Sequence, residues 1–307
     1  MNNLNSATKE GFVLLAGLTI GLLAGYLTFS SINPRLPHLS VSKLLSSSNH
    51  KPRILCWVMT APENHETRAI HVKRTWGKRC DKLLFMSTSS DSNLPAIKLD
   101  EAEEGIDNLW LKTKGAFRYI VEHHFDEADW FLKADDDTYV ILENLRYFLN
   151  QHDTNLPLYF GCKFRLYIEQ GYMSGGAGYV LSKEAVRRLA RETSQEGNIC
   201  DNNLIEYKGW IPEDVMLGKC LESLKVPAGD SRDEEGRHRF LALPPDMQFG
   251  PNPMVHWYWE YMYYQHEHGL KCCSDRTISF HYVTPNQMYA LEFLLYRMKP
   301  VVELSHS

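Results

Sequence analysis

The chain has 307 residues, of which 44% are hydrophobic, so the composition allows a sizeable core and argues against wholesale disorder. Its 33 basic and 38 acidic residues give a net charge of −5, and no block of like charge is present. Because nucleic acids are bound by clustered basic side chains, we expect no nucleic acid as the main partner.

The first feature along the chain is an apolar run between Gly11 and Pro34, which contains no charged side chain. A helix that spans a bilayer needs about 20 mostly apolar residues. We therefore predict a transmembrane signal anchor over residues 11–32, after a cytosolic tail of residues 1–10. Charge does not settle its orientation, because Lys9 is offset by Glu10. The short head and the large remainder favour a luminal C-terminal part.

Glycines recur at every fourth position of this run, at Gly17, Gly21 and Gly25. Such spacing lets two membrane helices approach closely and indicates a homodimer, although glycine is also simply common in membrane helices. The following residues, 33–50, are rich in serine and proline and predict a stem that holds a luminal domain of residues 51–307 away from the membrane.

After the stem, apolar runs typical of strands alternate with amphipathic stretches typical of helices. We expect strands within residues 53–60, 82–88, 129–134, 156–162 and 172–182, and helices within residues 66–77, 109–125 and 139–152. This alternation predicts an α/β fold around a mainly parallel twisted sheet. In such sheets, ligands bind just beyond the carboxyl ends of the strands.

Three adjacent carboxylates, Asp135, Asp136 and Asp137, follow directly after one of these expected strands. Their mutual repulsion and an apolar neighbourhood make it costly to keep them ionised. In an extended chain, the side chains of Asp135 and Asp137 point to one side and that of Asp136 to the other. Hard divalent cations prefer oxygen ligands, so the first and third aspartates predict a metal site, with Asp136 near a sugar or ribose hydroxyl. The alternative is a solvated turn.

A second acidic pair, Glu213 and Asp214, follows Pro212 at the expected start of a helix. Acids are favoured at helix starts by the helix dipole, and this role alone could explain them. Alternatively, one of them is a general base that takes a proton from an attacking hydroxyl. His281 lies in the apolar stretch ISFHYV, and this position suits either a histidine packed in the core or a metal ligand. No Ser-His or Cys-His nucleophile arrangement is evident.

Two further stretches have unusual composition. The glycines of SGGAGYVLS, residues 174–182, suit a close approach of the backbone to a ligand, or a bulge. HWYWEYMYYQ, residues 256–265, contains six aromatic residues, which would form core or, if the stretch is a strand, a flat face for a sugar.

Seven cysteines lack the CxxC spacing of a zinc site. In an oxidising lumen we expect the pairs Cys56–Cys80, Cys200–Cys220 and Cys272–Cys273, with Cys162 left free. The last pair joins neighbours whose Cα atoms are about 3.8 Å apart, so that bond would be strained.

Five motifs in this order, RAIHVKRTWG, WFLKADDDTYV, YMSGGAGYVLS, PEDVMLG and SFHYV, resemble the β1,3-glycosyltransferases of the Golgi, which include the fringe proteins. CWVMTAPENH, AGDSRD, WYWEYMYY and CCSDRTISFHYV are similar to the core 1 β1,3-galactosyltransferases of that family, over about Arg53 to Leu295. The resemblance implies a GT-A fold in a single-pass type II Golgi membrane protein. It also implies manganese as cofactor and inverting transfer of galactose from UDP-galactose to the 3-hydroxyl of O-linked N-acetylgalactosamine on glycoproteins.

The same resemblance implies roles for individual residues. The residues implied to hold the metal are Asp135, Asp137 and His281. The residues implied to bind the nucleotide sugar or its diphosphate are Met59, Asp107, Lys112, Asp136 and Tyr282. Asp214 matches the family's base, and the residues in motifs near the acceptor sugar are Gly176, Trp257 and Tyr258.

Three alternatives stay open from the sequence. The enzyme could use another donor and acceptor pair of the β1,3 class. A catalytically silent relative could act as a chaperone for an active transferase, and a membrane-anchored lectin would keep the aromatic residues without needing a base. Transfer that depends on manganese separates an enzyme from the last two.

Overall fold

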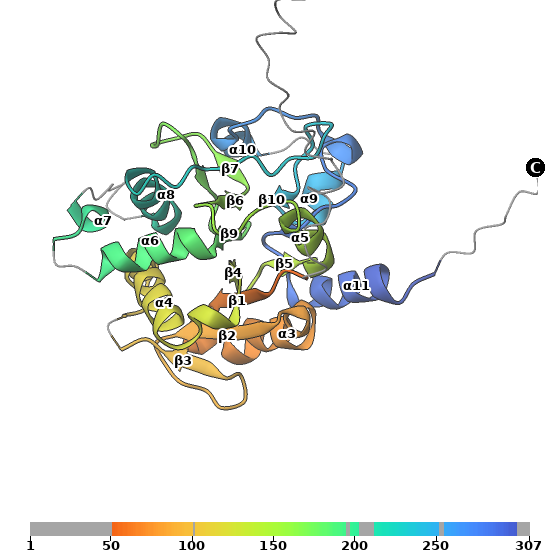
Figure 1. Cartoon of the computed structure of the whole chain (residues 1–307). Helices are drawn as coiled ribbons and strands as arrows, with labels where there is room; N and C mark the ends of the chain where they lie inside the picture. Colours follow the sequence, from red (N-terminus) through yellow and green to blue (C-terminus); the bar gives the residue numbers. More distant parts are fainter. Residues whose placement is uncertain (1–50, 101, 195–196, 203–211, 252–254, 300–307) are drawn as a thin grey trace, which may run out of the picture. The chain divides into compact units, whose positions relative to one another are not determined.

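A computed structural model of the chain describes residues 51–307 except residues 101, 195–196, 203–211, 252–254 and 300–307 (Figure 1). The predicted tail, anchor and stem therefore lie outside the described residues. Within the part that is described, no helix combines the length and apolar character needed to cross a bilayer.

A six-stranded sheet forms the centre of the fold. Its strand order is β3 (Ala96–Lys98), β2 (Lys82–Ser87), β1 (Ile54–Met59), β4 (Trp130–Asp135), β9 (Tyr179–Ser182) and β6 (Tyr159–Gly161). Strands β3, β2, β1 and β4 pair in parallel, whereas β9 pairs antiparallel with both β4 and β6. The predicted α/β fold and its parallel majority are confirmed, and the two last strands make the sheet mixed.

Both faces of this sheet are buried, because helices pack on each (Figure 1). On one face, Leu55 and Trp57 of β1 join the core formed with α4 (Leu109–His123), α6 (Lys183–Thr193) and α8 (Glu213–Ser223). On the other face, Ile54 and Val58 join the core formed with α3 (Ile70–Arg74), α5 (Leu142–Leu149) and α11 (Pro285–Tyr296). A central strand that is apolar on both sides explains the continuous hydrophobic run of β1.

Smaller elements complete the domain. A three-stranded sheet has the order β10 (Phe240–Leu241), β11 (Ser279–Phe280) and β5 (Tyr139–Val140), and β7 (Lys163–Phe164) pairs with β8 (Tyr172–Met173). The short helices are α7 (Ile199–Asn202), α9 (Pro245–Phe249) and α10 (His256–Tyr261). The short turns of 3₁₀ or π type are η1 (Pro62–Asn64), η2 (His65–Ala69), η3 (Trp76–Arg79), η4 (Ile106–Asn108), η5 (Phe125–Glu127) and η6 (Gly269–Lys271).

Three expectations about local structure need correction. The aromatic stretch begins with helix α10 rather than a strand, so its alternate rings do not share one face. The helix expected over residues 66–77 is divided into η2, α3 and η3, with Thr75 between the last two in a conformation that is neither helical nor extended. The helix expected over residues 139–152 begins at Leu142, because Tyr139 and Val140 pair with β11.

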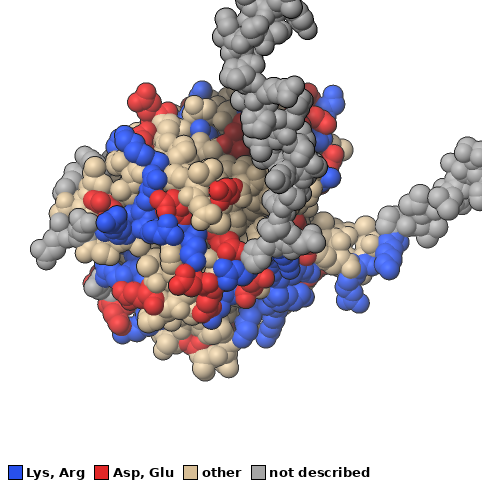
Figure 2. Space-filling model, in the orientation of Figure 1, with Lys and Arg blue, Asp and Glu red and all other residues tan. Residues whose placement is uncertain are grey.

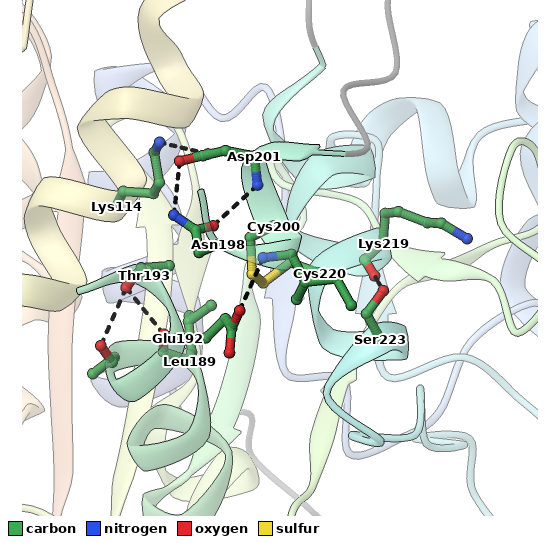
Figure 3. Close-up of a disulfide and its surroundings, with 12 residues drawn as sticks. Lys114, Leu189, Glu192, Thr193, Asn198, Cys200, Asp201, Lys219, Cys220 and Ser223 are labelled. Atoms are coloured by element: carbon green, nitrogen blue, oxygen red, sulfur yellow. Dashed lines mark hydrogen bonds and ion pairs between the residues drawn. A yellow bond between two sulfur atoms is a disulfide. The ribbon is translucent and has the colours of Figure 1, made fainter. Parts of the chain in front are cut away.

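The three predicted disulfides are present, Cys56–Cys80, Cys200–Cys220 and Cys272–Cys273, and Cys162 is free and buried. Figure 3 shows the Cys200–Cys220 bond, which joins α7 to α8. Beside it, Lys114 Nζ of α4 lies 2.7 Å from Asp201 Oδ1 of α7. The bond and the ion pair together fix α7 to two of the helices on one face of the sheet.

Charged side chains of both signs are interspersed over the face shown in Figure 2. Basic side chains gather over α3, and acidic side chains lie close to them in the same view.

Candidate active site

Strand β4 delivers the three aspartates to the carboxyl end of the parallel strands. Its residues Trp130 to Ala134 are buried, and Asp135 is paired in register with Met59, the last residue of β1. The turn that follows is fixed by Thr138, whose Oγ1 accepts a hydrogen bond from the Asp135 backbone nitrogen at 3.1 Å. The same hydroxyl donates to the Gly176 carbonyl oxygen at 2.7 Å. The cluster is therefore held in a defined geometry rather than lying in a freely solvated turn.

Asp135, Asp137 and His281 converge as the metal prediction requires. One potential ligand atom from each of them lies within 4.8 Å of the others. His281 follows β11 directly, and its Nε2 lies 3.4 Å from Asp137 Oδ1. Burial raises the pKa of Asp137, but its hydrogen bond to His281 and the nearby positive charges outweigh burial and lower the pKa overall. Two carboxylates and one imidazole form a donor set that suits a divalent cation such as Mn²⁺.

Asp136 is not part of this converging set, but the expected extended chain is wrong, because β4 ends at Asp135 and Asp136 and Asp137 lie in the turn that follows. Thr60 Oγ1 donates a hydrogen bond to Asp136 Oδ2 at 2.8 Å. Burial and the two neighbouring aspartates raise the pKa of Asp136 to about 6, against the opposing hydrogen bond from Thr60. Arg68, which sequence reasoning missed, places Nη1 at 3.6 Å from Asp136 Oδ1 and 3.4 Å from Asp137 Oδ2. Its half-exposed guanidinium can face both the acidic cluster and an anionic ligand.

The second acidic pair divides its roles between its two members. Glu213 is buried, and its Oε1 accepts hydrogen bonds from Thr113 Oγ1 and from the Tyr179 hydroxyl, both at 2.8 Å. Asp214 is half-buried, and its Oδ2 accepts a hydrogen bond from the Gly175 backbone nitrogen at 3.0 Å. Burial raises the pKa of Asp214 above its ordinary value, an effect that this hydrogen bond only partly opposes. Asp214 is therefore the better placed of the two to accept a proton.

A buried lysine connects the two acidic groups and was not singled out from the sequence. Lys133 Nζ lies 2.6 Å from Asp135 Oδ1 and 3.9 Å from Glu213 Oε2, and it donates to the Gly175 carbonyl oxygen at 3.1 Å. Burial alone would lower the pKa of Lys133, but the negative charges of Asp135 and Glu213 raise it above its ordinary value. The signal in the sequence was a charged residue inside the apolar run of β4.

Gly176 and Tyr282 both pack against the predicted metal ligand His281. A Cβ atom added at Gly176 would lie 1.9 Å from His281 Cε1 and 2.2 Å from Nε2, so only glycine leaves room for this ring. The His281 ring also stacks against Tyr282, with ring centroids 3.8 Å apart. Tyr282 has a φ of +56° and a ring that is half exposed. Gly176 thus leaves room for the ring of the predicted metal ligand, and its predicted role toward the acceptor sugar stays a prediction.

The residues predicted for the nucleotide lie in two places. Lys112 is buried, and its Nζ donates to the Thr60 carbonyl oxygen at 2.8 Å and pairs with Glu104 Oε2 at 2.9 Å. Met59 precedes Thr60, whose hydroxyl binds Asp136, so Met59 and Lys112 lie in one network with the acidic cluster. Asp107 lies exposed in η4, just before α4.

The two aromatic residues predicted for the acceptor differ in exposure. Trp257 is 37% exposed on α10, whereas Tyr258 has no exposed surface. The Tyr258 hydroxyl lies 2.9 Å from His266 Nε2 and accepts a hydrogen bond from Gln248 Nε2 at 3.3 Å. Because neighbouring residues of a helix point in different directions, only Trp257 offers a ring to an external ligand, and Tyr258 belongs to the core beneath it.

A serine, a histidine and an aspartate come together elsewhere, but not as a nucleophile arrangement. His65 Nε2 lies 2.9 Å from Ser87 Oγ, and His65 Nδ1 lies 3.4 Å from Asp91 Oδ2. Ser87 has no exposed surface, so its hydroxyl cannot reach a substrate. This trio fixes the segment after β2 against η2.

Two cavities lie outside the candidate site. His65 and Asp91 line a cavity of about 680 Å³, and an apolar cavity of about 590 Å³ lies beside α11. Neither cavity is lined by a residue predicted for the site.

Comparisons with known proteins found a matching family model, related sequences and structural neighbours. The model of the Fringe-like family matches residues 49–233. The chain is 46% identical over 264 residues to glycoprotein-N-acetylgalactosamine 3-beta-galactosyltransferase 1 of Xenopus laevis, covering 85% of this chain and 70% of the relative. It is 28% identical over 188 residues to a beta-1,3-glucosyltransferase of Mus musculus, covering 59% of this chain and 35% of the relative. A solved structure of the galactosyltransferase LgtC aligns with a TM-score of 0.45 and 9% identity, covering 80% of this chain and 97% of that one. This last likeness is too weak to carry an argument.

Proposed function

Since the chain belongs to the Fringe-like family, we propose that it is an inverting, metal-dependent galactosyltransferase. Its donor is UDP-galactose, and its acceptor is the 3-hydroxyl of O-linked N-acetylgalactosamine on glycoproteins. The donor and acceptor follow the relative from Xenopus laevis, with which the chain shares 46% identity. The observation that carries the reaction type is the convergence of Asp135, Asp137 and His281.

The donor side of the site is built from the acidic cluster and its cations. Asp135, Asp137 and His281 would hold a divalent cation, which when bound neutralises the charge that develops on the departing diphosphate. Arg68 lies beside Asp136 and Asp137 and is positioned to bind a phosphate oxygen. Asp136, which is turned toward Thr60, is available to a hydroxyl of the nucleotide sugar.

The acceptor side is built around Asp214. The acceptor 3-hydroxyl attacks the anomeric carbon from the face opposite UDP, a new C–O bond forms, and the bond to the diphosphate breaks. Asp214 accepts the proton of the attacking hydroxyl, a contribution of about 10²–10⁴-fold to the rate. The Gly175 backbone nitrogen holds this carboxylate in place, and Trp257 offers an exposed ring on which a sugar can stack. One base and no protein nucleophile is the set of groups that inversion requires.

The proposal also includes the identity of the cation, the fold type and the location of the protein. A donor set of two carboxylates and an imidazole favours Mn²⁺, and the mixed α/β sheet with acids at its carboxyl edge supports a GT-A fold. The apolar run of residues 11–32 supports a type II anchor in the Golgi membrane, with the catalytic domain in the lumen. The glycine spacing in that run supports a homodimer.

The test is transfer by the purified full-length chain in detergent, with a panel of UDP-sugars and an N-acetylgalactosamine-α-threonine peptide. We expect galactose transfer to the 3-hydroxyl that requires manganese and stops with chelator. Transfer of a different sugar would replace the donor in the proposal. A folded chain that transfers nothing from any donor would refute enzymatic function, and capture of a partner transferase would then favour the chaperone alternative.

A further inference from the structure

Lys133 lies at the junction of three segments that come together at the site. Its side chain is only 3% exposed, and its Nζ contacts Asp135 Oδ1 at 2.6 Å in β4. It also donates to the Gly175 carbonyl oxygen at 3.1 Å and lies 3.9 Å from Glu213 Oε2 at the start of α8. An ammonium group is buried only where such partners compensate its lost hydration. The position of Lys133 therefore depends on β4, on the segment of Gly175 and on the start of α8, and the relative positions of these three segments depend on Lys133.

Gly175 links Lys133 to the predicted base Asp214 through two backbone hydrogen bonds. Its carbonyl oxygen is held by Lys133, and its backbone nitrogen donates to Asp214 Oδ2 at 3.0 Å. A Cβ atom at this position would lie 3.0 Å from Glu213 Oε2 and 3.3 Å from Lys133 Nζ, so the backbone of Gly175 fits closely between these side chains. A shift of Gly175 would therefore move the hydrogen bond that orients the carboxylate of Asp214.

We propose that Lys133 is a positioning residue that fixes Asp135 of the metal set and, through Gly175, the base Asp214 in one geometry. The inference rests on the proposed function, because it gives Lys133 the role of holding the donor half and the acceptor half of that site at a fixed separation. Lys133 engages one oxygen of Asp135 and leaves the other for a cation. Removal of Lys133 would therefore disturb the alignment of the reacting groups more than the binding of the donor.

The direct test is Lys133→Met in the full-length chain. We expect kcat to fall about 10- to 100-fold, the usual effect of removing a group that orients a metal ligand or of a displacement near 1 Å. The dissociation constant of Mn²⁺ with UDP should stay within about threefold by calorimetry. Two effects keep this constant nearly unchanged. Asp137 and His281 contact each other and stay in place, and the weaker hold on Asp135 is offset because the Lys133 ammonium no longer repels the bound cation.

A second readout does not require activity. In the metal-free protein, amide hydrogen exchange of residues 174–178 should be faster in Lys133→Met than in the wild type, because the Gly175 carbonyl has lost its donor. Unchanged exchange in this segment would overturn the inference even if the wild-type chain proved to have no transferase activity. A wild-type chain without transfer would count against the proposed function alone.

Two control variants separate positioning from stability. Lys163 is also buried, and its Nζ donates to the Ala228 carbonyl oxygen at 2.9 Å, with Asp230 as the acidic group whose charge acts on it. Lys163→Met should lower thermal stability and leave kcat near the wild-type value. Lys133→Met combined with Glu213→Gln removes one positive and one negative charge, and it should recover stability without recovering kcat. A kcat in Lys133→Met within threefold of wild type would overturn the inference, as would an equal loss in Lys163→Met or recovery in the double variant.

Discussion

Gly176→Ala should disable the metal site through one methyl group. The added Cβ would lie 1.9 Å from His281 Cε1, 2.2 Å from Nε2 and 2.3 Å from Nδ1. Ordinary van der Waals contact begins near 3.4 Å, so the ring must move by about 1.5 Å. Metal–ligand distances tolerate deviations of only about 0.2 Å, and the stacked ring of Tyr282 blocks movement toward the ring face that it covers. His281 therefore cannot remain a ligand beside Asp137.

The expected magnitude follows from this displacement. A misplacement of about 1 Å at a reacting centre costs about 100-fold in rate, equivalent to about 2.7 kcal/mol. We expect kcat/KM for UDP-galactose to fall at least about 100-fold and Mn²⁺ binding, followed by electron paramagnetic resonance, to weaken in parallel. Gly115→Ala in α4 is the matched control, because its Cβ would meet Leu99 at 3.7 Å, an ordinary contact, and should leave both quantities unchanged. Wild-type Mn²⁺ affinity in Gly176→Ala would refute the assignment of His281 as a ligand.

Three further predictions concern the base, acid stability and a disulfide. Asp214→Asn should keep UDP binding by calorimetry and lose about 10²–10⁴-fold in kcat, and substantial turnover would contradict its role as base. Burial and the charge of His266 lower the pKa of His238 to about 3, so this ring stays neutral in the folded protein while it charges in the unfolded chain below pH 6.5. Stability is therefore lost as pH falls. Between pH 6 and 4.5, the free energy of unfolding measured with urea should decrease by about 2 kcal/mol more in the wild type than in His238→Gln. Replacing Cys56 and Cys80 together by alanine opens a loop with a sequence separation of 24 and should lower the free energy of unfolding by about 3 kcal/mol, with Mn²⁺ affinity retained.

The sequence predicted which side chains converge wherever a candidate residue lies next to a strong local pattern. The aspartates stand at the end of an apolar strand, and the grouping of Asp135 with Asp137 was predicted correctly, although from an extended chain that the turn at Asp136 and Asp137 replaces. His281 needed the family resemblance, because β11 before it has only two residues and gives little periodicity. The disulfides were predicted correctly, and each lies within one sequence neighbourhood, with separations of 24, 20 and 1.

Contacts between distant segments could not be predicted from local pattern. Thr60 is 76 residues from Asp136, Arg68 is 69 residues from Asp137, and Lys133 is 42 residues from Gly175. No periodicity connects such positions, because they depend on how the loops at the carboxyl ends of the strands pack. Trp257 and Tyr258 show the same limit: which ring is exposed depended on whether their stretch is a helix or a strand.

The charges of the site explain why three adjacent aspartates are tolerated. The structure brings together five carboxylates and two side-chain cations, with the carboxylates on Asp135, Asp136, Asp137, Glu213 and Asp214 and the cations on Lys133 and Arg68. With all of these groups ionised, five negative and two positive charges leave a net charge of −3. Lys133 compensates Asp135 and Glu213 from inside the protein, whereas Asp137 is compensated mainly by the imidazole of His281 and the half-exposed Arg68, and less by Lys133. The uncompensated charge therefore lies at the open side of the cluster, where a divalent cation would reduce it to −1 before the anionic diphosphate binds.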